Sequence, residues 1–145
     1  MNSAVSQSSP GVGVGKAWLI SLWLAQFILA ALFGMAGVMK TTMAPAMLAS
    51  SGMAWAADVP LLLVRFIGLV ELAGTVGVIL PALTRILPVL TPLAAAGFAT
   101  IQVLAIGFHA TRGETAETLP INIVLLALSL FVVWGRFRKA PIQPR

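Results

Sequence analysis

Four long apolar runs, separated by short polar or proline-containing segments, dominate the pattern of the chain. An α-helix needs roughly 20 apolar residues to cross the hydrocarbon core of a bilayer, and the runs approach or reach that length. The pattern therefore predicts an all-α fold, a bundle of four transmembrane helices, and no repeat or second domain is visible. The expected spans cover about residues 17–39, 61–80, 89–108 and 119–135.

Charged residues and prolines mark where these spans should begin and end. Lys16 and Lys40 flank the first run, and Pro60 and Pro81 bracket the second. A secretory signal peptide is the rival interpretation of the first run. It is disfavoured because the apolar region of such a peptide has only about 7–15 residues.

The pattern divides the chain into three segments. Residues 1–15 are rich in Ser, Gly and Val without periodicity, and they predict a disordered N-terminal tail. Residues 16–138 form a single four-helix membrane domain, and residues 139–145 form a short C-terminal tail on the cytoplasmic side. The segment 41–59 is too apolar for a free loop, so it is expected to lie along or dip into the membrane interface.

The composition narrows the class of protein. Hydrophobic residues make up 59% of the chain and charged residues only 9%, against about 45–50% and 25% in soluble domains. The chain has no cysteine and one histidine, which removes thiol chemistry, iron–sulfur clusters and multi-histidine metal sites. We therefore expect neither a metal nor a cofactor. The net charge of +5 sits in the flanks of apolar runs, where anionic lipid explains it better than nucleic acid.

The distribution of basic residues predicts the orientation in the membrane. Four spans put the N-terminus, the 82–87 turn and the C-terminus on one face, which carries six Lys and Arg residues. The opposite face carries Lys40 and Arg112, with Arg65 just inside the membrane. Because cytoplasmic loops are enriched in Lys and Arg, both termini are predicted to be cytoplasmic in a multi-pass protein of the cell membrane. The six residues are Lys16, Arg85, Arg136, Arg138, Lys139 and Arg145.

Small residues recur inside the spans at helical spacing. The pairs are Ala30 with Gly34 and Ala73 with Gly77, and the third span holds the run 94–97. Such residues let helices approach closely in lipid. They predict tight packing within one subunit, with the seam of a homo-oligomer as the alternative.

Ionisable residues at membrane depth are costly and by default indicate function. Glu71 lies about 16 Å into the second span at 1.5 Å per residue, near the bilayer midplane. It therefore needs a partner. The candidates are Arg65 on the same span, Gln26, Gln102, Thr75 or a bound proton.

Most of the unusual polar residues gather in the half of the bundle away from the termini. Gln102 and His109 are two helical turns apart and share a face of the third span. The other half is expected to be apolar apart from Gln26. This asymmetry predicts a pocket with a polar mouth and an apolar floor. Glu71 and His109 are the candidate acid and base, and the candidate binding residues are Lys40, Arg65, Gln102, Arg112 and Asn122.

Several short motifs, taken in order, resemble the DoxX-like family of small four-helix membrane proteins over about residues 20–136. Each motif is weak alone, but their joint order is specific. They are WLAQ at 23–26, FGMAGVMK at 33–40, RFIG at 65–68, ELAG at 71–74, LTPLAA at 90–95, HATRGE at 109–114, Asn122 and WGR at 134–136.

The resemblance implies a membrane-embedded protein tied in some members to redox or quinone systems. Family motif residues match at Lys40, Arg65, Glu71, His109 and Arg112. Without cysteines, a direct electron-carrying role through thiols is disfavoured.

Two functions stay open, and with them whether the protein is an enzyme. The first is a site for a lipophilic small molecule, such as a quinone or isoprenoid, with or without cofactor-independent proton transfer on it. The second is a non-catalytic accessory or scaffold subunit of a membrane redox complex. Proton-coupled transport is weaker, because a single carboxylate lies near the midplane and no broken-helix repeat is visible.

Overall fold

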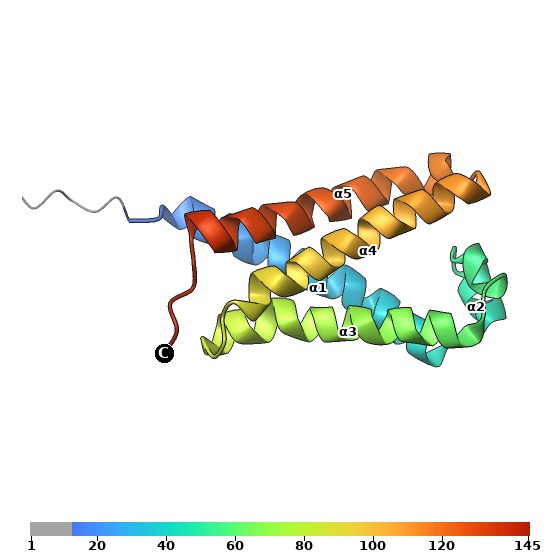
Figure 1. Ribbon diagram of the computed structural model, residues 1–145, viewed down its shortest axis with the longest axis horizontal. Coiled ribbons are helices and arrows are strands. Elements are labelled where there is room, and N and C mark those ends of the chain that lie inside the picture. Colours follow the sequence, from blue (N-terminus) through green and yellow to red (C-terminus); the bar gives the residue numbers. More distant parts are fainter. Residues whose placement is uncertain (1–12) are drawn as a thin grey trace, which may run out of the picture.

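The computed structural model describes residues 13–145, and this part of the chain is helical without any strand (Figure 1). Four helices are each long and apolar enough to cross a membrane. The predicted all-α, four-span fold is therefore confirmed. Residues 1–12 of the predicted N-terminal tail lie outside the described residues. The four helices are α1 (Lys16–Thr42), α3 (Leu61–Thr84), α4 (Leu90–Arg112) and α5 (Thr115–Trp134).

The four helices run up and down and pack as two antiparallel pairs, α1 with α3 and α4 with α5. Figure 1 shows the start of α1, the α3–α4 turn and the C-terminus at one end, here called the terminal end. The opposite end, here called the loop end, carries the α4–α5 turn and the connection from α1 to α3. That connection forms the short helix α2 (Pro45–Ser50) and the 3-10 turn η1 (Ala54–Ala57).

Two glycines bring α1 and α3 together near the loop end. A Cβ atom added to Gly68 would lie 2.8 Å from the Cβ of Lys40 and 3.0 Å from the carbonyl oxygen of Gly37. A Cβ added to Gly37 would lie 2.9 Å from the carbonyl oxygen of Gly68. The backbones are thus closer than any side chain at these two positions would allow, as in other membrane helix pairs built on small residues.

The predicted small-residue positions are used unevenly. Gly77 packs against Ala94 of α4, and Gly34 lies against Thr75 of α3, so both serve contacts within one chain. Gly97 has nothing within 4 Å of an added Cβ. The α1–α3 contact at Gly37 and Gly68 falls outside the pairs that the spacing singled out.

The larger core fills the middle and the terminal half of the bundle, and a smaller one, formed by Leu48, Ala56 and Val64, lies at the loop end. Phe33 and Phe98 stack face to face with ring centroids 3.8 Å apart, and Phe98 fits against Gly74, where a Cβ would collide with its ring. Large apolar side chains such as Leu62, 80% exposed, point outward over the helices and meet the acyl chains of the bilayer. The buried apolar cluster consists of Ala25, Leu29, Phe33, Val78, Ala95, Phe98, Leu125 and Val132.

Each of the four long helices extends beyond its expected span at one end or both. α3 continues through Pro81 to Thr84, because Pro81 lies in the last turn, where the backbone N–H of Arg85 still closes onto its carbonyl at 2.9 Å. α5 begins four residues before the apolar run, directly after a tight turn at Gly113 with φ of 74°. Its other end continues as the π-helical segment η2 (Gly135–Lys139).

Candidate functional site

A cavity of about 750 Å³ lies at the loop end, between all four long helices and the α2–η1 connection. Its walls are mostly apolar and include Phe33, Phe66 and Phe108. Of the seven candidate residues, Arg65 and Arg112 are not among those that line it. The five that do are Lys40, Glu71, Gln102, His109 and Asn122.

Glu71 is paired with Lys40, a partner that the sequence reasoning did not consider. The Nζ atom of Lys40 lies 2.7 Å from Oε1 and 2.8 Å from Oε2 of Glu71, and both side chains are buried. Lys40, expected from the sequence as a charge flanking the first span, is thus buried between α1 and α3. None of the proposed partners of the Glu71 carboxylate among the described residues forms a hydrogen bond with it.

The geometry of antiparallel helices explains this ion pair. Side chains on a helix tilt toward its N-terminus. Lys40 on α1 therefore reaches toward the terminal end, and Glu71 on α3 reaches toward the loop end. Lys40 stands level with Gly68, about 4.5 Å along the axis from Glu71, so the two tilts bring ammonium and carboxylate together.

Arg65 closes the end of α1 instead of pairing with Glu71. Its Nη1 atom donates a hydrogen bond to the carbonyl oxygen of Lys40. That carbonyl belongs to the last turn of α1, whose carbonyl groups have no partner within the helix. Arg65 therefore acts as a cap supplied by the neighbouring helix, and it fixes the backbone that carries the Lys40 side chain.

Gln102 on α4 and Asn122 on α5 are the two buried polar side chains of the cavity that have no partner. They are 4% and 8% exposed, and neither forms a hydrogen bond with any other described residue. Oε1 of Gln102 and Nδ2 of Asn122 are both inaccessible and unpartnered. A buried amide left in this state costs about 1–3 kcal/mol for each lost hydrogen bond.

A cluster of four polar side chains closes the loop end above the cavity. Glu114 accepts from Nε of Arg112 and binds Nδ1 of His109, each at 2.7 Å. Arg112 also donates through Nη2 to Oδ2 of Asp58 at 2.7 Å. Because Asp58 follows η1, this cluster joins the α1–α3 connection to the α4–α5 turn. The sequence reasoning missed Asp58, whose only signal is a lone carboxylate in an apolar connection.

The hydrogen bonds of this cluster act on the Glu114 carboxyl and on the tautomer of His109. The hydrogen bond from His109, followed by that from Arg112, lowers the pKa of the Glu114 carboxyl below its ordinary value. An ionised carboxylate only accepts hydrogen bonds, so Nδ1 of His109 carries a proton. In the neutral imidazole, Nε2 then holds the free lone pair and is the ring atom that can accept a hydrogen bond.

The terminal half is more polar than expected. Gln26 donates to the carbonyl of Val78 at 2.7 Å and accepts from Nε of Arg136 at 2.7 Å. Arg136, treated from the sequence as a flanking surface charge, is only 4% exposed. It points inward because Gly135 packs directly onto Leu22, which brings the start of η2 against α1.

The four spans and their buried polar network define a small multi-pass integral membrane protein. The sequence model of the DoxX-like family matches residues 24–132, and the chain belongs to this family. A search of curated proteins finds no match, and a search of solved structures also finds none. The matched region contains the whole loop-end cavity, whereas Arg136 and the C-terminal residues lie beyond it.

Proposed function

We propose that the protein binds a lipophilic small molecule with an oxygen-bearing head, such as a quinone or isoprenoid, in the loop-end cavity. The observation that carries this proposal is the unpartnered pair Gln102 and Asn122 in the wall of that cavity. A hydroxyl group of a bound molecule would donate to Oε1 of Gln102 and accept from Nδ2 of Asn122, whereas a carbonyl oxygen would accept only from Nδ2 of Asn122. The free energy that the unpartnered amides cost without a ligand would then be recovered when the ligand binds.

The size and lining of the cavity support an apolar ligand. Its volume of about 750 Å³ falls in the range of about 300–1,000 Å³ typical of small-molecule sites. Phe66 of α3 and Leu104 of α4 line it and are also 61% and 67% exposed on the bundle surface. The cavity therefore opens sideways toward the acyl chains, which is the direction from which a lipophile would enter.

The catalytic part of the proposal concerns proton transfer on the bound molecule. We assign the role of base to His109, because Glu114 holds its Nδ1 proton and leaves Nε2 free. Glu71 has both oxygens on the Lys40 ammonium group. In the proposed site, Glu71 holds the positively charged Lys40 side chain in the cavity wall near the ligand head. Glu71 does not act as the acid.

One observation favours the scaffold subunit as a second candidate function. The charged residues of the loop end converge on one another, with Lys40 on Glu71 and Arg112 between Asp58 and Glu114. Such pairing holds helices in register without any ligand. Under this alternative, lipid fills the cavity, and Gln102 and Asn122 do not contribute to the binding of any specific ligand.

Ligand-induced thermal stabilisation of the purified protein in detergent tests the proposal. A short-chain quinone and an isoprenoid alcohol are titrated into the wild type and into the Gln102→Leu and Asn122→Leu variants. Loss of one hydrogen bond to the head should weaken binding about tenfold or more in each variant. Thr100→Leu is the matched control on α4, because Thr100 is exposed and bonds only to its own helix.

The outcomes separate the two functions. Stabilisation of the wild type and of Thr100→Leu, with weaker binding by the two amide variants, supports the specific site. Equal stabilisation of all four proteins, or none of any, overturns it and leaves the scaffold subunit. Gln102→Leu and Asn122→Leu should be no less stable than the wild type without ligand, since each removes an unpartnered buried amide.

A further inference from the structure

Arg136 is a buried cation without an acidic partner. Its side chain is held at Nε by the neutral amide of Gln26, and its Nη2 atom is buried without an acceptor among the described residues. Its guanidinium also lies 5.2 Å from the ring centroid of Trp23, which is attractive but does not neutralise the charge. A buried charge is stable only when it is paired, so this site lacks an anion.

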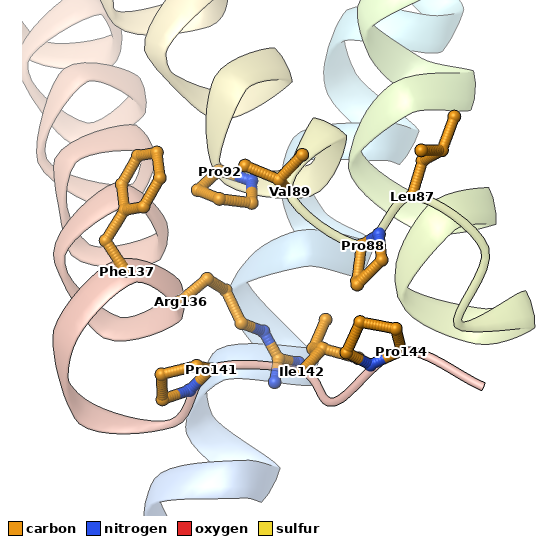
Figure 2. Close-up of a pocket in the computed structure, with 9 residues that line it drawn as sticks. All are labelled: Leu87, Pro88, Val89, Pro92, Arg136, Phe137, Pro141, Ile142 and Pro144. Carbon is orange, nitrogen blue, oxygen red and sulfur yellow. The ribbon is translucent and has the colours of Figure 1, made fainter.

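The side chain of Arg136 lines a second cavity, of about 390 Å³, at the terminal end. Figure 2 shows Arg136 extending from η2 toward residues 140–145, here called the C-terminal strap, beside Pro141 and Ile142. The strap crosses to the α3–α4 turn, where Nε of Arg85 donates to the carbonyl of Gln143 at 2.9 Å. The remaining walls are apolar, with Leu87, Val89 and Phe137 among them.

The charge distribution leaves no carboxylate side chain that could fill this role. The chain has four acidic residues, and all of them lie in the loop-end half, at Asp58, Glu71, Glu114 and Glu117. The terminal end instead carries further basic residues, including Arg85 and Lys139. The C-terminal carboxylate of Arg145, on the same strap, forms no ion pair with Arg136 among the described residues either. An anion from outside the chain would therefore supply the missing partner.

We propose that the terminal-end cavity binds a phosphate group, with Arg136 as the buried anchor and the C-terminal strap as one wall. Guanidinium groups bind phosphate oxygens through two parallel hydrogen bonds, and Arg136 keeps nitrogen atoms for this beyond the one that Gln26 uses. Both the headgroup of an anionic phospholipid and free phosphate carry this chemistry. The apolar walls would accommodate the glycerol and first acyl carbons of a lipid. This site is separate from the loop-end cavity and does not depend on the function proposed there.

Thermal unfolding of the full chain in a neutral detergent tests the proposal. Phosphatidylglycerol, phosphatidylcholine and inorganic phosphate are added separately to the wild type, Arg136→Met, Ile142→Trp and Arg138→Gln. Ile142→Trp should fill part of the cavity, which Ile142 lines, and should leave the Arg136–Gln26 contact intact. Arg138→Gln is the matched control, because Arg138 is an exposed arginine of the same segment.

The wild type and Arg138→Gln should gain about 3 °C or more from phosphatidylglycerol and nothing comparable from phosphatidylcholine. Arg136→Met and Ile142→Trp should lose this gain. The same pattern with inorganic phosphate alone would identify free phosphate as the ligand.

Equal gains for all four proteins would show attraction to the basic surface only and would overturn the proposal, as would no gain for the wild type. If Arg136→Met does not fold, the Ile142→Trp variant tests the proposal by itself. A thermal stabilisation of Ile142→Trp equal to that of the wild type would also overturn the proposal.

Discussion

At the scale of single residues, the buried cations of this protein are stabilised in different ways. Lys40 has a carboxylate at 2.7 Å, whereas Arg136 has only the oxygen of an amide and an aromatic ring. Arg65 is partly buried and donates to a backbone carbonyl at the end of α1. The consequences of removing each partner therefore differ, and the Lys40–Glu71 pair gives the sharpest test.

Removing the Glu71 carboxylate should destabilise the protein. Glu71→Leu leaves the buried Lys40 ammonium group without its partner, which should lower the free energy of unfolding by about 3 kcal/mol. The double change Lys40→Met with Glu71→Leu should recover most of this loss, because an apolar pair of similar volume is about neutral in such sites. Chemical denaturation in detergent micelles measures both effects.

Glu117→Leu serves as the control for this experiment. Glu117 is exposed at the start of α5, so its loss should change stability by no more than about 0.5 kcal/mol. Full stability in Glu71→Leu would contradict the prediction and would mean that Lys40 reaches water or loses its proton. Recovery by Arg65→Leu in place of Lys40→Met would instead make Arg65 the partner of Glu71.

At the scale of the helices, the α1–α3 crossing determines where the charged pair lies. Gly37 and Gly68 allow the two backbones to touch, and their contact sets Lys40 level with Gly68. The register of the crossing thus fixes the ion pair, and Arg65 reinforces it by binding the last turn of α1. A change in this register would separate Lys40 from Glu71 without altering either residue.

A methyl group at the crossing should therefore be costly. In Gly68→Ala the added Cβ would lie 2.8 Å from the Cβ of Lys40 and 2.9 Å from Cγ2 of Thr41, so α1 must shift. The free energy of unfolding should fall by about 1–3 kcal/mol, the usual cost of overpacking. Gly97→Ala, in the interior of α4 with open space around it, should be neutral or slightly stabilising, since alanine favours helix.

Thermal unfolding of the two glycine variants side by side provides the measurement. A loss in Gly97→Ala equal to that in Gly68→Ala would show that glycine is needed for some reason other than the close approach of α1 and α3.

At the scale of the whole molecule, all four acidic residues lie in the loop-end half, whereas six of the nine Lys and Arg residues lie at the terminal end. The bundle places both described ends of the chain at the terminal end (Figure 1), together with Arg85 of the α3–α4 turn. Aromatic rings gather there too, since Trp18 lies 5.5 Å from Trp134 and 5.9 Å from Phe131, centroid to centroid. Aromatic belts mark both membrane interfaces, and an excess of basic residues is typical of the cytoplasmic one.

The orientation prediction is that the terminal end faces the cytoplasm. A reporter that is active only outside the cytoplasm should give no signal when it is fused after Arg145. The same reporter inserted in the α4–α5 turn, after Gly113, should give a strong signal because that turn lies at the opposite end. The reverse pattern would contradict the positive-inside argument, and equal signals would contradict the up-and-down arrangement of the spans.

The sequence alone determined the number of spans, the all-α class and the family, because each of these depends on local pattern. A run of apolar residues long enough to span a bilayer must form a helix there, whatever its neighbours are, since its backbone groups find no water to bond. The same reasoning placed Lys40, Glu71, Gln102, His109 and Asn122 toward one half of the bundle.

Only the tertiary structure decided which polar groups meet. Lys40 pairs with Glu71 because two glycines fix the register of antiparallel helices, and Arg136 turns inward because Gly135 allows η2 to pack on Leu22. The Lys40–Glu71 and Arg136–Gln26 contacts do not follow from spacing along one helix, since they join residues 31 and 110 positions apart. The packing of all four helices sets the rotation and register of each helix. Rotation and register then determine which residues form ion pairs, which amides have no partner and which arginine is buried.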